Sequence, residues 1–116
     1  MKRHLLTALC SFLLTVAAIF AFAPLPTEVK LENPRVKVSS VTYAPGVARE
    51  RYIRPTDQVI VFLDDCKYQR TDSKTGEKTV RERKSGDVIW HDKGEDAPVL
   101  VNLGTTPYRT LVIELK

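Results

Sequence analysis

The stretch GDVIWHDKGEDA, residues 86–97, decides how the rest of the chain is interpreted, because its character changes within twelve positions. It begins with a glycine and the largely apolar run DVIW, which is typical of a short strand. The run HDKGED that follows combines a glycine with acidic side chains, which favours a turn. One histidine and four acidic residues also raise the alternatives of a metal site or a catalytic loop. The simplest interpretation is a strand, a turn and the start of another strand.

Similar apolar runs separated by turns continue along the chain. RVKVSSVTY (35–43) begins with valines at alternate positions, whereas QVIVFL (58–63) is continuously apolar and predicts a strand covered on both faces. PVLVNL (98–103) and YRTLVIEL (108–115) repeat the pattern, each preceded by turn residues. Five to eight short strands in about 80 residues predict an all-β fold of antiparallel strands, either a barrel or a sandwich.

The N-terminal segment differs from the rest and predicts export. Residues 1–23 have a basic start, an apolar run and a small-x-small ending, which together are typical of a signal peptide. Cleavage after Ala23 would place Pro24 beside the scissile bond, so cleavage after Ala18 is an alternative, and an uncleaved membrane anchor is another. Each alternative places the remainder outside the cytoplasmic membrane, periplasmic or secreted if the source is bacterial. Residues 24–34 hold three prolines and predict a linker, so the folded domain is expected over residues 35–116.

The charge balance gives no indication of nucleic-acid binding. The formal net charge is +4, and it falls to +2 when Lys2 and Arg3 are set aside, with 16 basic against 14 acidic side chains. The run KTGEKTVRERK (74–84) is locally basic but contains two glutamates. We interpret it as the solvated face of a hairpin rather than a phosphate-binding patch.

Two segments of the chain resemble the two sequence motifs of the cupin superfamily. The first motif has a glycine, an HxH pair, a glutamate and a closing glycine, and the second has a glycine, a PxG turn, a histidine and an asparagine. At the same spacing this chain has Gly46, Tyr52, Arg54, Gln58 and Asp65, then Gly86, the turn 92–94, Ala97 and, one position beyond the expected place, Asn102. The resemblance implies a small double-stranded β-helix barrel, often paired into dimers through sheet edges, with a metal held by three histidines and a glutamate.

The four metal-ligand positions implied by this resemblance are occupied here by Tyr52, Arg54, Gln58 and Ala97. A transition metal needs several converging imidazole, carboxylate or thiolate donors. Arg54 has only hydrogen-bond donors and a fixed positive charge, and Ala97 offers no donor atom. The sequence therefore predicts no metal and no other cofactor.

The same positions suggest a ligand-binding site of another kind. Residues 52 and 54 share a strand face by alternation, and Gln58 returns to that face, which the resemblance places inside the barrel. A buried arginine must pair with an acid or bind an anion, so we predict a small anionic or polyol ligand at Tyr52, Arg54 and Gln58, with Trp90 as an apolar wall. The competing interpretation pairs Arg54 with Glu50, Asp57 or Glu95, or leaves it in water at the barrel mouth.

The functional prediction is thus an exported, non-catalytic binding protein. His91 is the only histidine after the N-terminal segment, and we interpret it as a surface or turn-stabilising residue. Two alternatives remain. One is an interaction module that forms a homodimer or docks on an envelope protein; the other is a metal-independent isomerase or lyase with His91 or Tyr52 as base.

Overall fold

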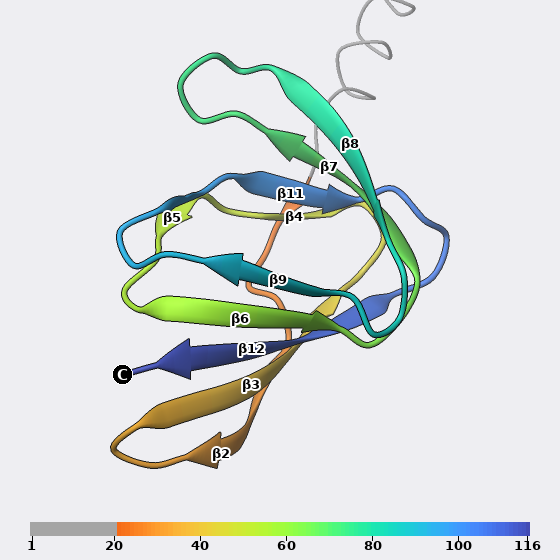
Figure 1. The fold of residues 1–116 in the computed structure, drawn as a ribbon. Coiled ribbons are helices and arrows are strands. Elements are labelled where there is room, and N and C mark those ends of the chain that lie inside the picture. Colours follow the sequence, from red (N-terminus) through yellow and green to blue (C-terminus); the bar gives the residue numbers. More distant parts are fainter. Residues whose placement is uncertain (1–20) are drawn as a thin grey trace, which may run out of the picture.

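The computed structural model describes residues 21–116 (Figure 1). The predicted signal or anchor segment, residues 1–23, therefore lies almost entirely outside the described residues. Residues 21–116 contain no helix with the length and apolar character needed to cross a membrane.

The described chain consists of strands and turns, which confirms the predicted all-β class. The longer strands are β2 (Thr27–Glu32), β3 (Val36–Tyr43), β6 (Asp57–Phe62), β7 (Cys66–Thr71), β8 (Lys78–Arg83), β9 (Val88–His91), β11 (Val99–Asn102) and β12 (Tyr108–Leu115). The shorter ones are β1 (Ala21–Phe22), β4 (Val47–Arg49), β5 (Tyr52–Ile53) and β10 (Asp96–Ala97).

These strands form two five-stranded sheets and one small ribbon. The first sheet has the order β1-β4-β11-β7-β8 and the second β2-β3-β12-β6-β9, while β5 and β10 pair with each other. All strand pairs are antiparallel except β1 with β4. In Figure 1 the first sheet lies above the second, with the β5 turn at one end of the barrel.

Strand β6 shows how the sequence sets the two faces of the second sheet. Its burial alternates, with Gln58, Ile60 and Phe62 buried and the residues between them half-buried. We predicted that both faces would be covered, and that prediction is wrong for the described residues. The half-buried valines, Val59 and Val61, alternate with Ile60 and Phe62 of the core and therefore lie on the opposite, outer face of the sheet.

Aromatic residues on the inner faces of both sheets make the core. Tyr43 and Tyr108 stack with ring centres 4.7 Å apart and planes 7° apart, and Phe62 and Tyr68 lie parallel with centres 6.2 Å apart. Each of these side chains is buried, and Ile60 completes the cluster. Because large aromatic rings bury much apolar area each, a few of them suffice to join the two sheets.

The ordered domain begins earlier than the sequence predicted. Residues 27–32, assigned to the linker 24–34, form the edge strand β2 and pair with β3. Its six residues are all exposed, so the burial pattern that identifies most strands is absent there. Strand β1 lies within the predicted signal segment; cleavage after Ala18 would keep it and cleavage after Ala23 would remove it.

Asn102 fixes the long β11–β12 connection to the rest of the barrel. Its buried side-chain amide donates to the backbone oxygens of Tyr43 and Thr106, both at 2.9 Å, and its oxygen accepts from the Gly104 N–H at 2.8 Å. The amide thereby satisfies three backbone groups that a shorter side chain would leave unpaired.

Replacing Asn102 by alanine is expected to lower the free energy of unfolding by about 2–3 kcal/mol, because buried polar groups lose their partners. Urea denaturation measures the change. Asn33→Ala is the matched control, since the Asn33 oxygen accepts from two backbone N–H groups in an exposed turn, and it should cost less than half as much. Equal losses for the two variants would contradict a structural role particular to Asn102.

Candidate functional site

A cavity of about 200 Å³ lies inside the barrel between the two sheets. Its walls combine aromatic side chains of the core with charged groups from the first sheet and from residues next to the β5–β10 ribbon. The arginine, histidine and acidic residues that line it are Arg49, Arg54, Arg70, Arg81, Arg83, His91 and Glu95. Five guanidinium groups therefore face one carboxylate.

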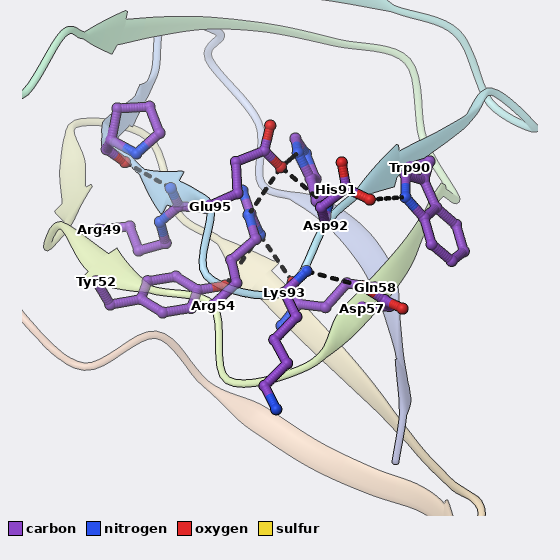
Figure 2. A network of polar contacts seen from close by, with 11 residues as sticks. Arg49, Tyr52, Arg54, Asp57, Gln58, Trp90, His91, Asp92, Lys93 and Glu95 are labelled. Carbon is purple, nitrogen blue, oxygen red and sulfur yellow. Dashed lines mark hydrogen bonds and ion pairs between the residues drawn. The ribbon is translucent and has the colours of Figure 1, made fainter.

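Arg54 lies deepest among these charges. It follows β5, and two backbone hydrogen bonds hold it to the β9–β10 turn. Its N–H donates to the backbone oxygen of Glu95 (3.0 Å), and the Gly94 N–H donates to the backbone oxygen of Arg54 (2.9 Å). The side chain is only 5% exposed. Its Nη1 donates to the Gln58 oxygen at 2.7 Å and lies 3.2 Å from the Tyr52 hydroxyl. The structure thus brings Tyr52, Arg54 and Gln58 together, as the sequence suggested (Figure 2).

The positive charge of Arg54 is only partly compensated. Glu95 is the one of the three predicted partners that approaches, with its Oε2 3.9 Å from Arg54 Nε, and that nitrogen has no hydrogen bond. Asp57 instead accepts from the backbone N–H of Lys93 at 2.8 Å. Burial lowers the pKa of the Arg54 guanidinium, and the neighbouring charge of Arg49 lowers that pKa further. An anion in the cavity would relieve both effects.

Sequence reasoning missed the other four arginines. Arg49 on β4 and Arg70 on β7 both pair with Leu100 of β11, so the three residues form one row on the inner face of the first sheet. The Arg49 guanidinium donates to the Pro98 oxygen, and its centre lies 5.3 Å from the Tyr52 ring centre.

The β7–β8 hairpin supplies the remaining two. Residues 74–84 are mostly exposed, as we predicted for a solvated hairpin face, but exposed Arg81 and half-buried Arg83 also line the cavity. Arg83 lies with its guanidinium 5.8 Å from the Phe62 ring centre and its Nε 3.4 Å from the Tyr68 hydroxyl. Strand alternation, rather than net charge, could have identified these two arginines in the sequence. Residues 81 and 83 share a strand face, and they pair with Tyr68 and Cys66 respectively.

Trp90 does not belong to the site. Its side chain is 51% exposed, and the indole N–H donates to Asp92 at 2.8 Å outside the barrel. The prediction of an apolar wall was wrong by one position, because alternation along β9 turns Trp90 outward and its neighbours Ile89 and His91 inward.

His91, which we interpreted as a surface or turn-stabilising residue, faces inward at the end of β9 and bonds Glu95 within the β9–β10 turn. Its Nδ1 lies 2.8 Å from Glu95 Oε2, which also accepts from the Asp92 backbone N–H at 3.2 Å. Burial lowers the pKa of His91, the charges of Arg54 and Arg49 lower it further, and the bond to Glu95 raises it in part. The net effect is a lowered pKa, so the His91 imidazole is neutral near pH 7.

The residues at the four predicted ligand positions do not fit a metal. Ala97 is fully buried and pairs with Tyr52 across the β5–β10 ribbon, so it brings no donor atom. Arg54 presents a positive charge to the same space. Residues 21–116 contain no group of three or more histidine, cysteine or acidic side chains arranged to hold a metal ion.

Comparison with known proteins identifies the fold. No protein-family model and no curated sequence matches the chain. Among solved structures, a cupin domain from Bordetella pertussis Tohama I matches with a TM-score of 0.74 at 18% identity, covering 84% of this chain and 99% of that one. A double-stranded β-helix protein from Klebsiella pneumoniae matches with a TM-score of 0.61 at 18% identity, covering 84% and 89%. The DMSP lyase DddQ from Ruegeria pomeroyi matches with a TM-score of 0.60 at 14% identity, covering 79% and 47%.

The chain therefore has the cupin fold, a small double-stranded β-helix, as its motifs predicted. Its cavity differs from the metal site that the resemblance implies, because arginines line it and the four ligand positions hold Tyr52, Arg54, Gln58 and Ala97.

His91 gives the barrel a pH dependence of stability. Because its folded-state pKa lies below the unfolded value of about 6.5, the unfolded chain binds the proton first as the pH falls, and stability is lost below that value. We expect the melting temperature of the wild type to fall between pH 7.5 and pH 5.5, and His91→Gln to remove a measurable part of that fall. Identical pH profiles for the two proteins would contradict this.

Proposed function

We propose that the protein binds a small anion, such as a carboxylate, a phosphate or a sugar acid, inside the barrel. The observation that carries the proposal is the excess of five arginines over one glutamate around a single cavity. Arg54 is buried, Arg49, Arg70 and Arg83 are half-buried, and Arg81 is exposed. Charges of one sign repel one another, and the desolvated charge of Arg54 lacks a close acidic partner, so an anionic ligand would stabilise this cavity. The predicted export signal would make this a periplasmic or secreted binding protein.

The geometry favours a ligand with polar groups as well as charge. Arg54 supplies a buried guanidinium, while Tyr52 and Gln58 beside it hold hydroxyl and amide groups that suit the hydroxyls of a sugar acid. A volume of about 200 Å³ equals about seven waters at about 30 Å³ each. That size fits an acid of roughly three to five carbons.

Neutralising one cavity arginine should weaken binding strongly. With malonate, succinate, glycerate and phosphate as probes in isothermal titration calorimetry, we expect at least one to bind, and Arg54→Gln and Arg83→Gln each to raise its Kd about 10- to 100-fold, because a charge-assisted hydrogen bond contributes about 1.5–3 kcal/mol.

Arg35→Gln is the matched control, since it removes the same charge from the exposed β2–β3 turn. Its Kd should stay within twofold of the wild type. Equal effects of Arg35→Gln and Arg54→Gln would show that only the overall charge matters and would contradict a site in the barrel.

A second candidate function, self-association, rests on the outer face of the second sheet. The register places Leu31, Val38, Ile113, Val59 and Trp90 in one row across all five strands. A second row runs through Leu111, Val61 and Val88. We propose that this apolar outer face, defined by these two rows, forms a homodimer, because exposed apolar area of such extent marks interaction surfaces.

Charge placed on the apolar outer face should dissociate the dimer. Sedimentation velocity is expected to show a dimer for the wild type and a monomer for Val88→Lys. Val80→Lys is the matched control, because Val80 is also about half exposed but lies on β8 of the other sheet. A monomeric wild type at tens of micromolar would rule out the dimer.

A further inference from the structure

His91 is placed to do more than complete a turn. It is the last residue of β9, it pairs with Gln58 of β6 across the sheet, and its ring lines the cavity that holds the five arginines. The bond to Glu95 uses only one ring nitrogen. Figure 2 shows the ring and the Glu95 carboxylate next to the Arg54 guanidinium.

The hydrogen-bond partners determine which nitrogen of His91 carries the hydrogen. An ionised carboxylate accepts hydrogen bonds and cannot donate them, so Nδ1, at 2.8 Å from Glu95 Oε2, is the N–H nitrogen. In a neutral imidazole the other nitrogen then carries a lone pair. The Asp92 backbone N–H holds the same carboxylate oxygen at 3.2 Å, which fixes the acceptor and with it the ring. His91 and Glu95 therefore form a base and its positioning partner.

We propose that the His91 Nε2 removes a proton from the carbon next to the ketone of a small 2-oxo acid bound in the arginine cavity. A C–H bond of that carbon breaks, its electron pair moves into the new C=C bond, and the carbonyl π pair moves onto the ketone oxygen. The proton goes to Nε2, and returning a proton to the carbon regenerates the ketone, so no other reactant is consumed. The class of reaction is an enolisation, the first step of isomerisations and eliminations.

The surrounding charges suit this step. Arginine groups hold the carboxylate of the acid, and the Arg54 guanidinium with the Tyr52 hydroxyl beside it can stabilise the charge that develops on the ketone oxygen. Burial and the charges of Arg49 and Arg54 lower the pKa of His91, which leaves it unprotonated near neutral pH. Arg70, Arg81 and Arg83 of β7 and β8 line the same cavity and add to its positive charge. Glu95 alone among the charged lining groups offsets the imidazolium that forms.

The proposal rests on the anion site proposed above, and the test separates the two. Pyruvate and 2-oxobutanoate are the probes, and calorimetry measures their binding. Proton exchange is followed in D₂O as the loss of the NMR signal of the protons on the carbon next to the ketone, after subtraction of the rate in buffer alone. For the wild type we expect protein-dependent exchange that rises with pH through the His91 pKa, below 6.5.

His91→Gln should lower the exchange rate at least 100-fold, the contribution typical of a general base, while the Kd stays within about threefold. Glu95→Gln should reduce the rate about tenfold and move the midpoint of the pH profile to lower pH, because the lost carboxylate charge no longer raises the His91 pKa; Glu95→Asp should restore part of the rate. If His91 and Glu95 only stabilised the turn, replacing them would change neither the pH profile of proton exchange nor the ratio of the exchange rate to Kd.

Glu82→Gln is the matched control, since it makes the same change of charge as Glu95→Gln at an exposed acid of β8 that does not line the cavity. The proton-exchange rate of this variant should equal that of the wild type. Binding of either acid without exchange would overturn the proposal and leave the anion site standing. If succinate or phosphate binds but neither 2-oxo acid does, the assignment of the substrate class is overturned. If no anion binds, the proposed anion site is overturned as well.

Discussion

The guanidinium of Arg54, with its fixed charge inside the barrel, is the constraint on which the rest of the site depends. It cannot lose its proton near neutral pH, so its surroundings must supply hydrogen bonds or negative charge. Gln58 gives a bond at 2.7 Å, and Glu95 approaches no closer than 3.9 Å. Part of the positive charge of Arg54 therefore remains uncompensated, which is why we propose an anionic ligand. The same charge also gives Glu95 two roles, as counter-charge to Arg54 and as the hydrogen-bond acceptor of His91.

The sequence predicted the all-β class, several strand positions and the cluster of Tyr52, Arg54 and Gln58, because these follow from local alternation and from motif spacing. It failed where the outcome depends on pairing between distant strands. Trp90 and His91 exchanged expected faces because the phase of a four-residue strand cannot be fixed without its partner.

The arginines illustrate the same limit more strongly. Arg49 and Arg70 become neighbours only because both pair with Leu100 of β11, and no local pattern states that pairing. The exposed edge strand β2 was missed for a different reason, since a strand without a buried face shows no apolar alternation.

The five-stranded sheet β2-β3-β12-β6-β9 is unusual in the chemistry of its two faces. The face toward the barrel carries Gln58 and His91 next to apolar side chains, whereas the outer face carries an unbroken apolar row. Antiparallel sheets with one solvated face normally show polar side chains there. The proposed ligand would use the polarity of the inner face, and the proposed homodimer would use the apolarity of the outer face. One sheet would then support both proposed functions without a shared residue.

The arginines around the cavity also bear on how long the molecule survives. Arg70, Arg81 and Arg83 lie on the β7–β8 hairpin and Arg49 lies on β4 of the same sheet, while Arg54 follows β5. Their repulsion therefore acts within the first sheet as well as between that sheet and Arg54 when the barrel closes. An anion that binds only the closed barrel offsets that repulsion and raises the folded population by mass action. Proteases degrade transiently opened chains in proportion to their population when reclosing is fast. If the proposed anion binds in this way, the steady-state abundance of the protein would follow the concentration of that anion, and the empty barrel would be the short-lived form.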